Sequence, residues 1–127
     1  MTRAEAFDKA WRIGIKEKDF SFVYEIYHPD YKAVDAFTDV ECNIEADIQV
    51  IKTIGDTITV TKTSVLYERD DFLKVHRYGR HKDADIFHSV ITELTYKDDK
   101  IISQKTTIEE LETDPSEGQD WKWEEYE

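Results

Sequence analysis

The order of two periodicities along the chain predicts an α+β fold. In three stretches before residue 55, apolar residues recur every three or four positions, which is the spacing of amphipathic helices. After residue 56 the pattern changes to alternation, and four long runs rich in Thr, Val and Ile follow with short linkers between them. Alternation is typical of strands, and short linkers join antiparallel neighbours. We therefore predict a curved antiparallel sheet wrapped over three N-terminal helices.

The first helix is predicted over residues 4–17. Thr2 precedes it and Glu5 follows three residues later, which is the pattern of a capping box. Its apolar face consists of Phe7, Ala10, Trp11, Gly14 and Ile15.

The second helix is predicted to begin at Asp19 as its cap and to end at Pro29, because proline disfavours helical geometry in the residue before it. Residues 31–37 then read as a short strand. Asn43 is predicted to cap the third helix, and Gly55 to stop it. The apolar residues of that third helix are Ile44, Ile48, Ile51 and Ile54.

The four strand-like runs span residues 57–67, 72–82, 86–97 and 100–111. In the third run, the face with Leu94 is the more apolar one and should lie against the helices. The opposite face still carries Phe87 and Ile91. Apolar residues on both faces indicate that the outer face is covered as well, most simply by a second copy of the chain in a homodimer.

Composition excludes several partners. The chain has 127 residues and a formal net charge of −12, which opposes binding to nucleic acid or to an anionic membrane surface. Nine of the acidic residues lie in 109–127, so most of the excess charge belongs to the tail. Cys42 is the single cysteine, and neither a signal peptide nor a membrane-spanning run is evident. We therefore expect a cytoplasmic protein.

Several motifs, in order, resemble the nuclear transport factor 2-like superfamily, also called SnoaL-like or ketosteroid isomerase-like. They are the helix with Trp11, the stretch 18–20 that opens the second helix, the turn at 27–30 followed by Asp35, and the late hairpin at 96–102. Asp99 stands where that hairpin usually has glycine, a mild departure because Asp tolerates positive φ. The resemblance covers about residues 3–111 of a single domain spanning 1–127. It implies a cone-shaped fold with a central pocket and, commonly, a dimer through the sheet face.

The resemblance also implies candidate site residues. Asp35 falls where isomerase-like members place the carboxylate that moves a proton beside a carbonyl, and its apolar neighbours would raise its pKa. Trp11 and Thr92 stand where such isomerases have two oxyanion donors. Neither is a strong donor, so steroid isomerase activity is not expected. The structural alternatives are Trp11 as a core anchor and Asp35 as a strand-end residue bonded to backbone amides or to an arginine.

His88 shares the expected inner face with Thr92 and is a candidate acid or base partner of Asp35. Tyr27 and Phe37 are candidate lining residues. The sequence leaves open whether His76 and Tyr78 or Arg77 and His81 point inward. Arg77, Arg80 and Lys82 would suit an anionic substrate if they were inward, but a solvated strand is the simpler interpretation. No metal-ligand spacing is recognised and no cofactor is expected.

The acidic tail, residues 112–127, carries Trp121 and Trp123. Rings of that size gain from burial, so we expect them to dock on the domain or across a dimer partner. The alternative is a peptide that engages another protein. For function, we expect a domain that binds a small hydrophobic molecule without turning it over. The alternative is an enzyme of the isomerase, cyclase or dehydratase type with Asp35 as base.

Overall fold

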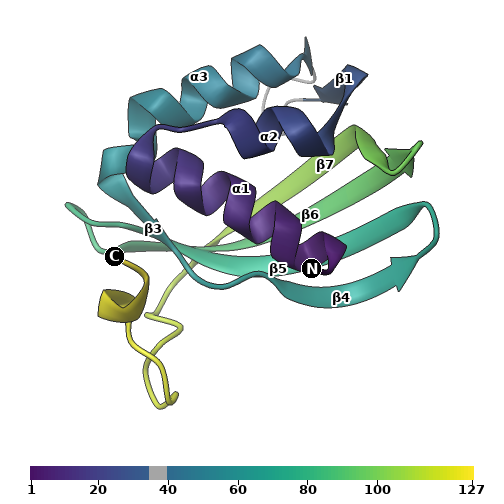
Figure 1. The fold of residues 1–127 in the computed structure, drawn as a ribbon. Helices are drawn as coiled ribbons and strands as arrows, with labels where there is room; N and C mark the ends of the chain where they lie inside the picture. Colours follow the sequence, from purple (N-terminus) through teal and green to yellow (C-terminus); the bar gives the residue numbers. More distant parts are fainter. Residues whose placement is uncertain (35–39) are drawn as a thin grey trace.

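The computed structural model describes residues 1–34 and 40–127, and within them the chain is α+β, as predicted. These residues form three α-helices, two short 3-10 helices and a seven-stranded sheet (Figure 1). The helices are α1 Arg3–Glu17, α2 Ser21–Ile26 and α3 Ile44–Ile54, and the 3-10 helices are η1 Gly55–Thr57 and η2 Trp123–Tyr126. The strands are β1 Tyr27–Val34, β2 Glu41–Cys42, β3 Ile58–Val60, β4 Ser64–Arg69, β5 Phe72–His81, β6 Ile86–Lys97 and β7 Lys100–Leu111.

The sheet is curved, and the helices lie on one of its faces (Figure 1). Its strand order is β2-β1-β7-β6-β5-β3, with β4 also paired to β5. Strands β4 to β7 form the predicted antiparallel meander, but β1 pairs with β7 in parallel. The prediction of an entirely antiparallel sheet is therefore wrong at this pair. The direction of β1 is not determined by a hairpin, because its partner lies far along the chain.

Both predicted caps of α1 and α3 are confirmed. The Thr2 side chain accepts a hydrogen bond from the Glu5 backbone N–H, and the Thr2 N–H donates to the Glu5 carboxylate, both at 3.1 Å. The Asn43 side chain accepts from the Ala46 N–H at 3.0 Å, and α3 ends at Gly55 as predicted. Each cap satisfies backbone donors that a first turn leaves without a helical partner.

The second helix is shorter than predicted, and Pro29 does not end it. The Asp19 carboxylate accepts from the Ser21 N–H at 3.0 Å and the Ser21 hydroxyl at 2.6 Å, so the helix begins after this local turn. The chain is already extended at Tyr27. Pro29 lies inside β1, where the register against β7 shifts between Tyr27 and Lys32. A proline without an N–H is tolerated in a strand where pairing is irregular.

The run 57–67, predicted as one strand, is two. Strands β3 and β4 both pair with β5, and the stretch between them is fastened in other ways. Thr61 Oγ1 accepts from the Tyr78 N–H at 2.9 Å, while the Thr63 N–H and hydroxyl donate to Asp8 on α1 at 3.0 and 2.9 Å. Alternation alone cannot reveal this break, because threonine has the same strand preference on either side of it.

The face of the sheet under the helices holds the core. Leu73, Val75 and Leu94 are at most 1% exposed and pack in one cluster with Phe7 and Trp11 of α1. Thr92 and Leu94 are both buried, so the predicted inner face of residues 86–97 is confirmed. The same alternation in β5 puts Arg77 and His81 inward with Leu73 and Val75, and His76 and Tyr78 outward. This settles which face of β5 points to the helices.

The tail lies beyond the other face of the sheet (yellow in Figure 1). Trp121 stacks on Tyr78 with ring centroids 6.1 Å apart, and Trp123 stacks on Phe87 at 6.0 Å. Trp123 is 3% exposed, and its indole N–H donates to Asp114 at 2.9 Å. The two rings therefore dock on their own domain, and this contact accounts for Phe87 on the outer face. A homodimer through the rest of that face stays a prediction.

Replacing Trp123 with alanine tests the tail contact. Removing a buried indole leaves a cavity, so we expect Trp123→Ala to lower the free energy of unfolding by about 3 kcal/mol in urea denaturation. Lys122→Ala, at an exposed position beside it, is the control and should change the free energy by less than about 0.5 kcal/mol. Equal stability of the two variants would show that the tail does not pack on the sheet.

Candidate functional site

A cavity of about 430 Å³ lies between the inner face of the sheet and the helices α1 and α3. Strands β3, β5, β6 and β7 form its sheet side, and β1 and β2 contribute Ala33 and Cys42. Much of the wall is apolar. Val50, Ile54 and Ile108 line it while each remains at least 36% exposed. The fold therefore leaves apolar surface unburied at this place, which a fitting molecule would cover.

Trp11 and Tyr27 form a buried chain of hydrogen bonds beside the cavity. The Trp11 indole N–H donates to the Tyr27 hydroxyl at 3.0 Å, and that hydroxyl donates to Gln104 Oε1 at 2.6 Å. Burial raises the pKa of Tyr27 far above its usual value, so the phenol stays protonated. Trp11 and Gln104 line the cavity, whereas Tyr27 is 3% exposed and lies in the core. The Trp11 N–H is thus already engaged and is not offered to a ligand.

Two other predicted site residues do share the cavity. Thr92 and His88 both line it, on the same face of β6. They are four positions apart, or about 13 Å along the strand, so they lie at different depths of the cavity. The His88 ring lies against the His81 ring, with centroids 5.3 Å apart. The remaining predicted residues, Asp35 and Phe37, lie outside the described residues.

Arg77 is the cavity residue that sequence reasoning undervalued. It stands opposite Val90 in the β5–β6 register and lines the cavity, so the interpretation of a solvated strand is wrong for this residue. Its Nε is shielded from solvent and has no hydrogen-bond partner in the described part of the chain. Burial lowers the pKa of Arg77. The signal was present in the sequence: placing Leu73 and Val75 inward also places Arg77 inward.

The Asp8 carboxylate on α1 already has hydrogen-bond partners within the protein. Asp8 accepts from Arg12 Nε and a second Arg12 nitrogen, both at 3.2 Å, and from Thr63. Burial of Asp8 opposes its ionisation, but the bonds from Arg12 and Thr63 outweigh it and hold the pKa of Asp8 below its ordinary value. Arg12 also donates to the Val60 and Thr61 carbonyls at 3.0 and 2.9 Å. These contacts hold α1 against residues 60–63, the kink between β3 and β4.

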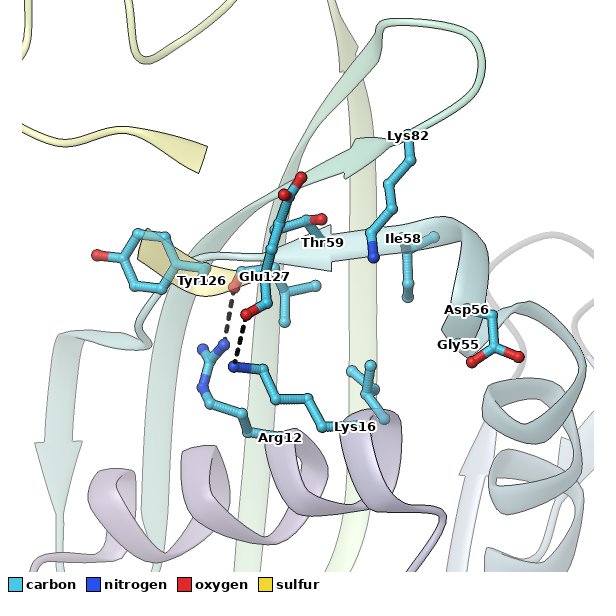
Figure 2. Close-up of a pocket in the computed structure, with 11 residues that line it drawn as sticks. Arg12, Lys16, Gly55, Asp56, Ile58, Thr59, Lys82, Tyr126 and Glu127 are labelled. Atoms are coloured by element: carbon cyan, nitrogen blue, oxygen red, sulfur yellow. Dashed lines mark hydrogen bonds between the residues drawn. The ribbon is translucent and has the colours of Figure 1, made fainter. Parts of the chain in front are cut away.

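A second, smaller cavity of about 200 Å³ lies beside the last turns of α1, against β3 and the end of the tail (Figure 2). Lys16 donates to the Glu127 carbonyl at 3.3 Å across it, and Arg12 to the Val60 carbonyl. Lys16 and Arg12, two of the cations that line it, are therefore engaged in hydrogen bonds within the protein. The larger cavity, with its open apolar wall, is the better candidate site.

Within the described residues, no group of three or more His, Cys, Asp or Glu side chains is placed to hold a metal ion. Over the same residues, no helix combines the length and the apolar character that crossing a membrane requires.

The chain resembles known proteins in structure but not in sequence. No family model matches the chain, and no curated protein matches it. Solved structures do match. An NTF2-like protein from Anabaena variabilis has a TM-score of 0.67 at 9% identity, over 83% of this chain and 84% of that one. A steroid delta-isomerase from Pseudomonas aeruginosa has a TM-score of 0.62 at 15% identity, over 86% and 81%.

A third match, IdmH from Streptomyces antibioticus, is described as a proposed polyketide cyclase. It has a TM-score of 0.63 at 12% identity, over 85% of this chain and 93% of that one. The chain has the nuclear transport factor 2-like fold. At these identities the likeness establishes the fold alone, since proteins of one fold serve unrelated functions. In this nuclear transport factor 2-like domain, the site must be argued from its own residues.

Removing the Tyr27 hydroxyl tests the buried chain. Tyr27→Phe would leave the Trp11 N–H and the Gln104 carbonyl without their partner, so we expect a loss of about 2 kcal/mol in the free energy of unfolding. Tyr24→Phe is the matched control, because the Tyr24 hydroxyl bonds Glu45 on the surface and Tyr24 is 50% exposed. Urea denaturation of both variants makes the comparison. A Tyr24→Phe loss as large as that of Tyr27→Phe would contradict the argument.

Proposed function

We propose that this domain binds a small, largely apolar molecule in the cavity between α1, α3 and the sheet. The observation that carries the proposal is the cavity itself, whose 430 Å³ falls in the range of small-molecule sites. Its wall combines exposed aliphatic side chains with a few polar groups, among them Thr92, Gln104 and His88. Such a wall favours an apolar body and orients it through a small number of polar contacts.

Filling the cavity from β6 tests the proposal. Val90 lines the cavity and faces Arg77 and Ile108 in register, while Ile91 next to it faces outward. A neutral fluorescent probe, N-phenyl-1-naphthylamine, should bind the natural chain saturably. Val90→Phe should weaken that binding at least tenfold, because the added ring occupies the space. Ile91→Phe places the same ring on the outer face and should leave the affinity within about twofold of the natural chain.

Probe binding that does not saturate, or that survives Val90→Phe unchanged, would overturn the proposal. Thermal unfolding of both variants controls for loss of fold, since a folded Val90→Phe chain is needed to interpret lost binding.

The alternative function is proton transfer beside a carbonyl group, with Asp35 as base and His88 assisting. It is supported by His88 and Thr92 lining one cavity and by the steroid delta-isomerase among the structural neighbours. Against it, the Trp11 N–H that would face an enolate oxygen is bonded to Tyr27 at 3.0 Å. An enolate needs such donors, so non-catalytic binding remains the better supported function.

Hydrogen–deuterium exchange separates the two functions. With 2-tetralone in D₂O, an enzyme of this type should accelerate exchange of the protons next to the carbonyl, as followed by NMR. Asp35→Asn should then abolish the acceleration, whereas Asp30→Asn, at an exposed carboxylate, should not change it. Exchange no faster than in buffer is the result expected for binding without catalysis on this ketone.

A further inference from the structure

Arg77 brings a positive charge into a cavity whose wall is mostly apolar. Leu73 and Val75 on the same face of β5 are at most 1% exposed, and the strand continues inward with Arg77. The guanidinium carbon lies 5.8 Å from the centroid of the Phe7 ring, which gives it one favourable but weak contact. A charge held in such surroundings is costly unless it is paired and hydrogen-bonded.

The protein supplies no such pair from the residues described. No carboxylate among them forms an ion pair with Arg77, and its Nε is an orphan donor. Asp8, whose charge favours ionisation of Arg77, has its oxygens taken by Arg12 and Thr63. Asp47, which also lines the cavity, accepts from the Tyr31 hydroxyl at 3.0 Å. Among the residues described, the Arg77 Nε–H donor is therefore left without a partner at the wall of a space large enough for a ligand.

We propose that the molecule bound in this cavity is a hydrophobic carboxylic acid, whose carboxylate pairs with Arg77 while its apolar body lies along α3. The inference rests on the proposed function and names the ligand class for the same site. A carboxylate matches the guanidinium fork in shape and charge and can accept two parallel hydrogen bonds. A phosphate is a poorer fit, because Arg80, which also lines the cavity, already pairs with Asp85 at 2.9 Å, and Thr92 and Gln104 are neutral.

The apolar body is inferred from the wall facing Arg77. Val50 and Ile54 of α3 are 54% and 36% exposed and lie on the helix that closes the cavity opposite the sheet. An aromatic or aliphatic group placed there would bury these side chains, and its acid end would reach the strand that carries Arg77. The site thus has one charged contact for orientation and an apolar surface for affinity.

A pair of probes that differ in charge but hardly in shape tests the inference. Isothermal titration with 2-naphthoate and with 2-naphthamide at neutral pH compares an anion with its neutral counterpart. The natural chain should bind naphthoate at least tenfold more tightly, as expected for a desolvated, charge-assisted pair. Arg77→Met should abolish that preference, and Arg77→Lys should keep part of it, because lysine has the charge without the fork.

Lys74→Met is the matched control. It removes one positive charge from the same strand, but on the outer face, where Lys74 lies 3.9 Å from Glu93. The preference for naphthoate should therefore persist. In thermal unfolding without ligand, Arg77→Met should raise the midpoint, because it removes a half-buried charge that has no carboxylate partner among the described residues. That result also shows that the variant folds.

The outcomes separate the two proposals. If both probes bind equally well, the cavity is a binding site but the carboxylate inference is wrong. If neither probe binds, and N-phenyl-1-naphthylamine does not bind either, the proposed function itself fails. If the preference survives both Arg77→Met and Arg77→Lys, another group recognises the anion and Arg77 does not.

Discussion

The inner face of the sheet changes character along its strands, and the rest of the structure depends on this gradient. At one end, Leu73, Val75 and Leu94 are completely buried under α1. At the other end, the same faces continue with Arg77, Gly79 and His88, which cannot fill the space below the helices in the same way. A side-chain carbon added at Gly79 would meet nothing within 4 Å. Close packing at one end and an open cavity at the other follow from this order of residues.

Helices α1 and α3 differ in how completely they are packed on this face. Helix α1 is anchored over the closed end by Phe7 and Trp11, and its polar side is fastened to the β3–β4 kink by Asp8 and Arg12. Helix α3 has only Ile48 fully buried, while Val50 and Ile54 remain accessible along the cavity. The helix that closes the cavity is therefore the one with the least complete packing. A ligand bound in the cavity would complete the packing of this helix.

The outer face shows how an apolar residue pattern can be satisfied in more than one way. Phe87 on the outside of β6 led to the expectation of a covering partner. Its nearest cover is the tail of the same chain, through Trp123. The strand pattern indicated correctly that something covers this face, but alternation carries no information about which segment does so. The acidic charge of the tail stays at the surface, while its rings are used for packing.

The prediction of the site was uneven for reasons that particular residues illustrate. Thr92 and His88 were placed on one inner face from alternation, and the structure puts both in one cavity. Arg77 obeys the same alternation, but a charged residue between polar neighbours is usually solvated, so its position was given too little weight. Tyr27 was expected at the cavity wall and lies instead in the core, where its hydroxyl is bonded to Trp11 and Gln104.

The sequence by itself determined the local elements of this protein: the caps at Thr2 and Asn43, the helical and alternating periods, and hence the α+β class. These depend on interactions between residues close in the chain. Only the tertiary structure decided the parallel pairing of β1 with β7, the contact of Asp8 with Thr63, the docking of Trp123 and the cavity between the helices and the sheet beside Arg77. Each of these joins segments far apart in the chain. Their contacts follow from how the elements pack together, which no local pattern specifies.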